Sequence, residues 1–281
     1  MIELVLKPEA GQFAVHTPFV VRSGQEVHLF YAKCDYPAGL RTLAFAKRYE
    51  IFDAVSRDGK GWKGLAKPVL SMHYSVCRPW VVEADGGWRM YFVRSWSPRD
   101  YRVWSAWSAD LKAWTPDSVA LFESFDGQNH LASPCVVEAG GNKQRMYFTG
   151  AVASGEMDSI YVAESADGKK FSVDQAAKYR PKKGSKYGRS CYTPFVFKEG
   201  AKWKMLFAGA GDDGRRRTFL AEGRDGVSFG DGREVIDLAG DSRFAWGAYK
   251  AVLFEDQVYF VGLDGDRRGA IYRAPRSDFG I

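Results

Sequence analysis

The sequence has little cysteine and no long apolar run. Its four cysteines are widely separated and include no Cys-x-x-Cys pair, which argues against a disulfide scaffold, a zinc knuckle or a dithiol motif. No segment approaches the roughly 18 consecutive apolar residues that a membrane-spanning helix needs. Residues 1–30 lack the basic head, apolar block and cleavage site of a secretion signal. We therefore expect a cytoplasmic protein with reduced thiols and no membrane partner.

A large excess of one charge is also missing. The chain has 40 Lys and Arg residues against 34 Asp and Glu residues, a formal net charge of +6. We find no basic stripe and no nucleic-acid-binding module, so we expect no nucleic-acid partner. The basic clusters at 182–186 and 215–217 are interpreted as solvated loops. A small anionic molecule suits this modest positive excess better.

Helical periodicity is absent, and internal repetition takes its place. No window of 12 or more residues keeps a helical period of apolar residues. Instead, a Ser-x-Asp-Gly-x-x-aromatic motif recurs at intervals of 52, 57, 58 and 53 residues, in weaker form in its last two copies. Its aspartates are Asp58, Asp110, Asp167, Asp225 and Asp278. Stretches that begin at Pro18, Pro79, Pro134 and Pro194 run in phase with it, and the fifth copy, which has lost its proline, reads Lys250-Ala251-Val252-Leu253.

Each repeat predicts three or four short antiparallel strands, because its segments are β-branched and aromatic and are bounded by Gly and Asp turns. One such sheet cannot bury both of its faces, whereas radial packing of several sheets can. We therefore predict an all-β fold, a five-bladed β-propeller, in a single domain over residues 1–281. Its blades cover roughly 10–65, 66–120, 121–178, 179–236 and 237–281. The extended segment 2–6 is predicted to join the last blade and close the ring.

The repeat pattern resembles that of a known clan of enzymes. The rhythm Pro-x-Val-Val, Met-Tyr-Phe-x-Gly and Ile-Tyr-Val-Ala-x-Ser-x-Asp-Gly-x-x-Phe is similar to that of the five-bladed arabinanase, β-fructosidase and levansucrase clan of glycosidases. The resemblance implies an Asp directly before the first and second prolines, and a Glu two residues before the third. Here those places hold Thr17, Arg78 and Ala132, which do not exchange protons as carboxylates do.

A standard two-carboxylate glycoside hydrolase is therefore not expected. A loop acid is the remaining source of a carboxylate, and the candidates are Asp35, Asp126, Glu156 and Asp212.

Three of the four histidines lie in or just before the predicted innermost strands of consecutive blades. His16, His73 and His130 stand two, six and four residues before their prolines, so alternation places them on equivalent faces. They are candidate catalytic residues, which bind substrate or transfer protons. Alternatively they bind one divalent transition metal (Zn, Fe or Mn), although the unequal offsets place them at different depths. A third interpretation is that strand-end backbone groups satisfy them.

Cationic and aromatic side chains share these strand starts. Arg78 stands where the clan has an Asp, so the local charge becomes more positive by two units, and Arg binds phosphate or carboxylate groups bidentately. The predicted substrate-binding residues are Thr17, Arg78, Arg189, Tyr192, Trp246 and Lys250.

Together these features favour an enzyme that uses histidine-based chemistry on a small anionic ligand (phosphorylated, uronic or nucleoside-like) at the centre of the ring. Two alternatives stay open: a three-histidine metal-dependent oxidoreductase, lyase or hydrolase, and a non-catalytic carbohydrate-binding propeller.

Overall fold

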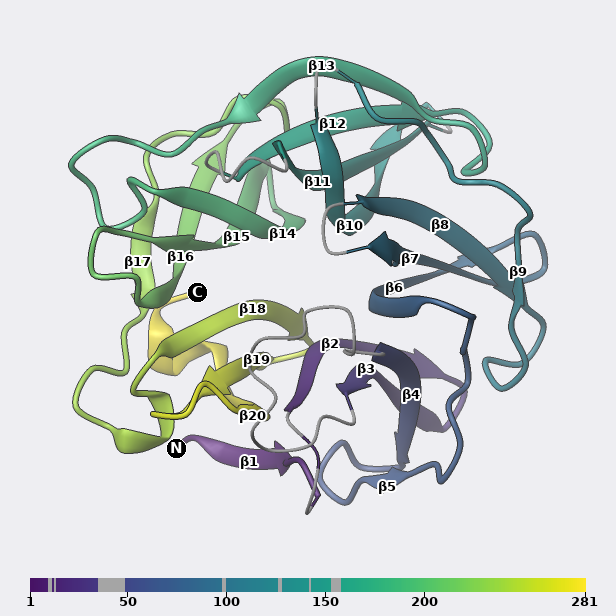
Figure 1. The fold of residues 1–281 in the computed structure, drawn as a ribbon, viewed down its shortest axis with the longest axis horizontal. Helices are drawn as coiled ribbons and strands as arrows, with labels where there is room; N and C mark the ends of the chain where they lie inside the picture. The colour runs from purple at the N-terminus through teal and green to yellow at the C-terminus, as the bar shows by residue number, and fades with distance from the viewer. Residues whose placement is uncertain are drawn as a thin grey trace.

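Short antiparallel strands, joined by tight turns, form the described parts of the chain. The computed structural model describes residues 1–9, 12, 14–34, 49–97, 100–125, 128–141, 143–152 and 158–281. The strands form five antiparallel blades, arranged around a common centre in chain order (Figure 1). Single parallel bridges between β8 and β10, β16 and β18, and β20 and β2 join neighbouring blades. Helical structure within the described residues is limited to two short 3-10 segments, η2 (Ser242–Phe244) and η3 (Arg276–Phe279).

Each blade is an antiparallel sheet that starts from the centre of the ring. The first blade holds β2 (Ala14–Ser23), β3 (Glu26–Cys34), β4 (Tyr49–Ser56) and β5 (Lys63–Gly64). The second holds β6 (Ser75–Ala84), β7 (Gly87–Ser97), β8 (Asp100–Ser108) and β9 (Thr115–Pro116). The third holds β10 (Gln128–Gly140), β11 (Lys143–Val152), β12 (Ser159–Ser165) and β13 (Ser172–Tyr179). The fourth holds β14 (Ser190–Glu199), β15 (Lys202–Ala210), β16 (Arg216–Gly223) and β17 (Arg233–Ile236).

The fifth blade takes its outer strand from the other end of the chain. It consists of β18 (Gly247–Phe254), β19 (Gln257–Leu263), β20 (Gly269–Pro275) and then β1 (Glu3–Leu6), which pairs antiparallel with β20. The Arg273 guanidinium donates to the Glu3 carboxylate at 2.9 Å, and the amino group of Met1 lies 2.7 Å from Asp278. The predicted all-β propeller, with a ring closed by the N-terminal strand, is confirmed.

The repeated Asp turns lie between the third and fourth strands of a blade, and the turn at Asp167 contacts the neighbouring blade. The Asp167 carboxylate accepts backbone N–H bonds from Lys169 and Lys170 at 2.8 and 2.9 Å. Gly168, with φ +69°, occupies the left-handed region that favours glycine. Its carbonyl accepts the hydroxyl of Tyr91 from the preceding blade at 2.8 Å. The same turn recurs at Asp58, Asp110 and Asp225, followed by Gly59, Leu111 and Gly226 with positive φ.

A β-bulge recurs near the start of all five innermost strands. Each bulge contains one non-glycine residue with φ between 52° and 58°. We call these five residues the bulge ring: Thr17, Arg78, Ser133, Thr193 and Lys250. A left-handed conformation costs a non-glycine residue roughly 1–2 kcal/mol, and strain of this kind persists only where the surrounding structure imposes it.

The bulge ring corrects one detail of the repeat alignment. The sequence pattern aligned Lys250 with the prolines and Tyr249 with the residues before them. In the structure the bulge lies between Tyr249 and Val252, so Lys250 is equivalent to Arg78 and Ala251 takes the place of the proline. The alignment was wrong by one residue because the lost proline removed its reference point.

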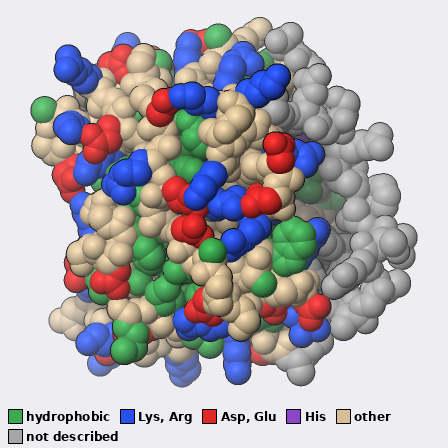
Figure 2. Space-filling model, turned by 90° about the vertical axis from the view of Figure 1, so that its left-hand side faces the viewer, with side chains coloured by type: hydrophobic (Ala, Val, Ile, Leu, Met, Phe, Trp, Pro, Cys, Tyr) green, Lys and Arg blue, Asp and Glu red, His purple; other side chains and the backbone are tan. Residues whose placement is uncertain are grey.

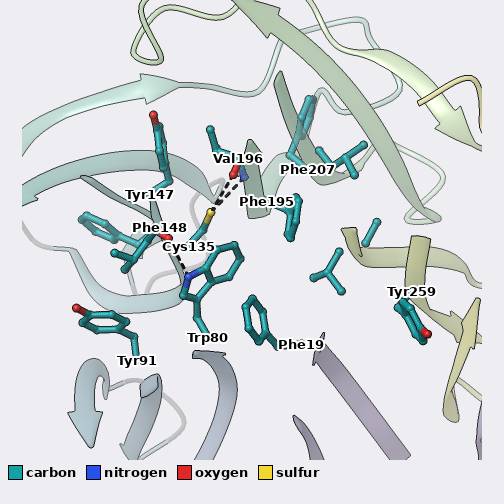
Figure 3. Close-up of a cluster of buried hydrophobic side chains, with 14 of the residues drawn as sticks. Phe19, Trp80, Tyr91, Cys135, Tyr147, Phe148, Phe195, Val196, Phe207 and Tyr259 are labelled. Carbon is teal, nitrogen blue, oxygen red and sulfur yellow. Dashed lines mark hydrogen bonds between the residues drawn. The ribbon is translucent and has the colours of Figure 1, made fainter. Parts of the chain in front are cut away.

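Beyond the bulge ring, apolar side chains pack across the axis. The Trp80 ring lies 4.6 Å from Phe19 and 5.4 Å from Phe195, between ring centroids. Its indole N–H donates to the Val136 carbonyl at 2.9 Å, and Cys135 Sγ accepts from a backbone N–H (Figure 3). Because Trp80 belongs to the second blade and Phe195 to the fourth, this contact crosses the centre of the ring. We call Phe19, Trp80, Cys135, Phe195 and Val252 the axial plug.

Opposite charges are mixed on the outer surface. Figure 2 shows one side of the molecule, where Lys and Arg side chains lie among Asp and Glu side chains. The cluster at 182–186 is paired in this way, because Lys182 contacts Asp231 and Lys186 lies 2.6 Å from Glu234. Within the described residues, no helix is long and apolar enough to cross a membrane.

Candidate functional site

Polar side chains gather at the end of the ring where the innermost strands begin. The third strand of each blade starts at this same end, because alternate strands run in opposite directions. His16 of β2 therefore packs against Tyr49 of β4, with ring centroids 4.7 Å apart. His130 of β10 packs against Tyr101 of β8 at 4.2 Å. The innermost and third strands together supply the residues of the candidate site.

Arg78 occupies the centre of this group. Its positive charge shifts the pKa of His130 and Asp158 from the third blade, of Tyr192 from the fourth and of Lys250 from the fifth. One side chain that influences three other blades must extend toward the axis. Arg78 is only partly buried.

Asp158 supplies a carboxylate that the motif comparison does not reveal. It lies directly before β12 and is partly buried. Burial raises its pKa, while the positive charges of Arg78 and Arg216 oppose that shift. Of the described carboxylates, it is the only one whose pKa is clearly shifted by Arg78. A carboxyl group with a raised pKa is suited to donate a proton.

Arg216 and two tyrosines line the wall next to Asp158. The guanidinium carbon of Arg216 lies 4.9 Å from the ring centroid of Tyr249 and 5.6 Å from that of Tyr192. Arg216 is exposed, yet neighbouring protein desolvates it while Tyr192, Tyr249 and Asp158 raise its pKa. The Arg216 guanidinium thus lies beside two aromatic rings and within electrostatic range of Asp158.

The rest of the bulge ring is buried. Thr17, Ser133, Thr193 and Lys250 are 2%, 0%, 2% and 1% exposed. Within the described part of the chain, their side-chain hydroxyls and the Lys250 ammonium have no hydrogen-bond partner. Burial lowers the pKa of Lys250 to about 8, and the nearby charge of Arg78 acts in the same direction.

The three predicted histidines do not form one group. His73 is exposed and lies before β6, where it packs against Tyr74 at 4.7 Å. His16 and His130 contact different tyrosines from different blades. Among the residues that the structure describes, no three His, Cys, Asp or Glu side chains could hold a metal ion together. The structure thus gives the three-histidine metal site no support, and the unequal strand offsets explain why.

His130 has the surroundings of a neutral imidazole. Burial lowers its pKa to about 4, and the charge of Arg78 acts in the same direction. An imidazole of this kind forms hydrogen bonds without carrying charge near neutral pH.

The other predicted substrate-binding residues have diverse environments. Tyr192 is buried beside Arg216, and Thr17 and Lys250 belong to the buried part of the bulge ring. Trp246 donates its indole N–H to Gly265, and Arg267 stacks on its ring at 3.8 Å. Arg189 is exposed on the segment before β14.

Of the four candidate loop acids, only Asp212 lies within the described residues. It is exposed after β15. Asp35, Asp126 and Glu156 lie outside the described residues.

The sequence analysis considered acids between the second and third strands but named Glu156 and not Asp158. It also interpreted the cluster 215–217, which includes Arg216, as a solvated loop, and this was wrong: Arg216 and Arg217 begin β16, and Arg217 is buried. Asp158 and Arg216 stand at the starts of third strands, which reach the same end of the ring. The available signal was a charged residue at the junction of a loop and a third strand, next to the segments 160–163 and 217–220.

Known proteins match this chain in sequence over part of its length and in fold over nearly all of it. No protein-family model matches the sequence. A β-1,2-mannobiose phosphorylase from Thermoanaerobacter sp. (strain X514) is 29% identical over 123 residues, which is 39% of this chain and 40% of the relative. The match therefore spans well under half of that relative's length.

Solved structures share the fold over nearly the whole chain. A β-1,2-mannobiose phosphorylase from Listeria innocua, in complex with β-1,2-mannobiose, has a TM-score of 0.78 at 14% identity and covers 99% of this chain and 98% of its own. A glycoside hydrolase has the same TM-score and identity over 96% and 89% of the two chains. A structure from work on glycoside hydrolases within the GH130 family of mannoside phosphorylases has a TM-score of 0.72 at 15% identity, over 97% and 91%. The chain has the propeller fold of these enzymes.

Proposed function

We propose that the protein is a carbohydrate-active enzyme that cleaves a small glycoside with inorganic phosphate, and that the axial end of the propeller is its active site. The observation that carries this proposal is the position of Asp158, a carboxyl group of raised pKa within electrostatic range of both Arg78 and Arg216. In this proposal Asp158 is the proton donor, and the two guanidinium groups within its electrostatic range bind the anion.

This combination fits phosphorolysis better than hydrolysis. Hydrolysis needs a carboxylic acid to protonate the leaving oxygen and a second carboxylate to activate water or attack the sugar. Phosphate is already an anion near neutral pH and attacks without a carboxylate base. Two guanidinium groups suit its negative charge, and each can donate two parallel hydrogen bonds to a pair of phosphate oxygens. The anionic ligand expected from the sequence is then the co-substrate.

The proposed step balances as a single displacement. A phosphate oxygen bonds to the anomeric carbon as the glycosidic carbon–oxygen bond breaks. The leaving oxygen takes the proton of Asp158, and the products are a glycosyl phosphate and a shortened sugar. His130, neutral near pH 7, and the nearby tyrosines bind sugar hydroxyls in this scheme.

The mannoside relatives supply the first substrate to test. The purified protein would be incubated with β-1,2-mannobiose, with and without inorganic phosphate, and the products followed by ³¹P NMR and sugar chromatography. We expect mannose 1-phosphate and mannose only when phosphate is present, and loss of the glycosyl phosphate in Arg78→Met and Arg216→Met variants.

Other outcomes discriminate between functions. Free mannose released at the same rate without phosphate would contradict phosphorolysis and indicate a hydrolase. If the protein binds mannosides but forms no product from mannobiose, with or without phosphate, the carbohydrate-binding alternative is favoured.

A further inference from the structure

The buried part of the bulge ring presents hydrogen-bond donors that the fold itself leaves unpartnered. Lys250 is 1% exposed, and within the described residues its ammonium has no hydrogen-bond partner. The hydroxyls of Thr17, Ser133 and Thr193, at equivalent positions of three other blades, are in the same condition. Buried polar groups without partners are rare in folded proteins, and each needs an explanation.

Lys250 points toward the axis. It belongs to the fifth blade, yet the groups that shift its pKa come from Cys77 and Arg78 of the second blade and Cys135 of the third. The Lys250 ammonium thus lies within electrostatic range of the second and third blades.

None of the protein groups that shift the pKa of Lys250 carries a negative charge that could neutralise its ammonium. Cys77 and Cys135 are the only acidic groups among them. Burial raises the pKa of both thiols, to about 12 for Cys135, so both stay uncharged. A buried ammonium without a counter-charge is costly, and an ammonium offers three donors and no acceptor. The missing partner is therefore an acceptor that carries negative charge.

We propose that the bulge ring binds a small monovalent anion such as chloride, through the Lys250 ammonium and the hydroxyls of Thr17, Ser133 and Thr193. The ligand must be small, because all four groups are at most 2% exposed, and a bound ion is enclosed and stripped of its water. This site differs from the proposed phosphate site, where Arg78 is only partly buried and Arg216 is exposed. The anion offsets the buried charge and ties four blades together at the centre of the ring.

Bromide provides a direct test of position. Crystals grown without halide would be soaked in sodium bromide and measured at the bromine absorption edge. We expect an anomalous peak within hydrogen-bond distance of Lys250 Nζ. A peak only beside Arg78 and Arg216, or an ordered water or phosphate beside Lys250 with no bromide peak, would overturn the proposal.

Thermal unfolding tests the same site in solution. We expect the Tm of the wild-type protein to be about 2–5 °C higher in sodium bromide, at tenfold over its dissociation constant, than in sodium gluconate of equal ionic strength. Gluconate is the control because it is too large for an enclosed site. Lys250→Met replaces the ammonium with an apolar chain of similar length and should abolish the difference.

A second variant keeps the test valid if Lys250→Met does not fold. Thr193→Val keeps the shape of the side chain and the ammonium but removes one donor, and should reduce the bromide-dependent shift by at least half. An undiminished shift in Lys250→Met, or in Thr193→Val where Lys250→Met does not fold, would refute the assignment.

Discussion

Replacing Asp158 with Asn tests the proposed chemistry most sharply. The change keeps the size of the side chain but removes the proton that the leaving oxygen needs. General acid catalysis contributes about 10²–10⁴-fold, so kcat for a disaccharide should fall by that factor, about 2.7–5.5 kcal/mol in activation free energy. Phosphate bound to Arg78 and Arg216 offsets the two charges that oppose the raised pKa of Asp158. Binding of the co-substrate thus favours the protonated acid.

The leaving group distinguishes this role from a structural one. A nitrophenolate leaves without protonation, so Asp158→Asn should retain most of its activity on a nitrophenyl glycoside and lose it on a disaccharide. The pH profile gives a second signature, because wild-type activity requires the protonated carboxyl group and falls as pH rises through its raised pKa. That alkaline limb should be missing from the residual activity of the variant.

Stability supplies the control for folding. A raised folded-state pKa means that the contribution of Asp158 to stability is present at low pH and is lost as pH rises through that pKa. Asp158→Asn should therefore unfold at an equal or higher temperature than the wild-type protein above neutral pH. Asp212→Asn, at an exposed described acid, should leave both activities unchanged. Equal losses on the two substrates, or no loss on the disaccharide, would refute the assignment of Asp158 as the acid.

Three further predictions concern the fold around the site. The depressed pKa of His130, about 4, means that its contribution to stability is lost as pH falls from about 6.5 through 4, so His130→Gln should flatten the Tm profile over that range. Gly168→Ala places a Cβ 2.9 Å from the Tyr91 hydroxyl, whereas Gly24→Ala, also at positive φ, meets nothing within 4 Å. In urea unfolding, the free energy of unfolding should fall by about 1–2 kcal/mol for Gly24→Ala. It should fall further for Gly168→Ala. Trp80→Ala opens the axial plug and should cost about 3–5 kcal/mol by the same assay, and a loss below 1 kcal/mol would contradict its packing across the axis.

The repeat predicted the architecture because each element of it has a structural task. Asp167 and its equivalents accept backbone hydrogen bonds that hold the turns between strands, and the proline stretches mark four of the five bulges. Where the proline was lost, the alignment at Lys250 shifted by one residue. The repeat therefore located each bulge only where its proline was present.

The site was less predictable, because it depends on which strands reach the same end of the ring. Arg78 and Tyr192 were found from the innermost strands alone. Asp158 stands directly before the third strand β12 and Arg216 begins the third strand β16. Both are more than 20 residues away in sequence and come near the others only after folding. The statistical concentration of histidines in these segments did not indicate a common site, since His73 lies before its strand and is exposed.

The closure of the last blade by β1 has a consequence for synthesis on the ribosome. Glu3 and Arg273 are 270 positions apart, so β1 must remain without its partner until β20 has been translated. Each of the first four blades is built from strands that are consecutive in sequence, so each can form as it is translated. The fifth blade also needs β1, which precedes the first blade. Closure of the fifth blade thus depends on two segments far apart in sequence, and a circular permutant opened between two blades, with β20 followed by β1, would let every sheet form from neighbouring segments.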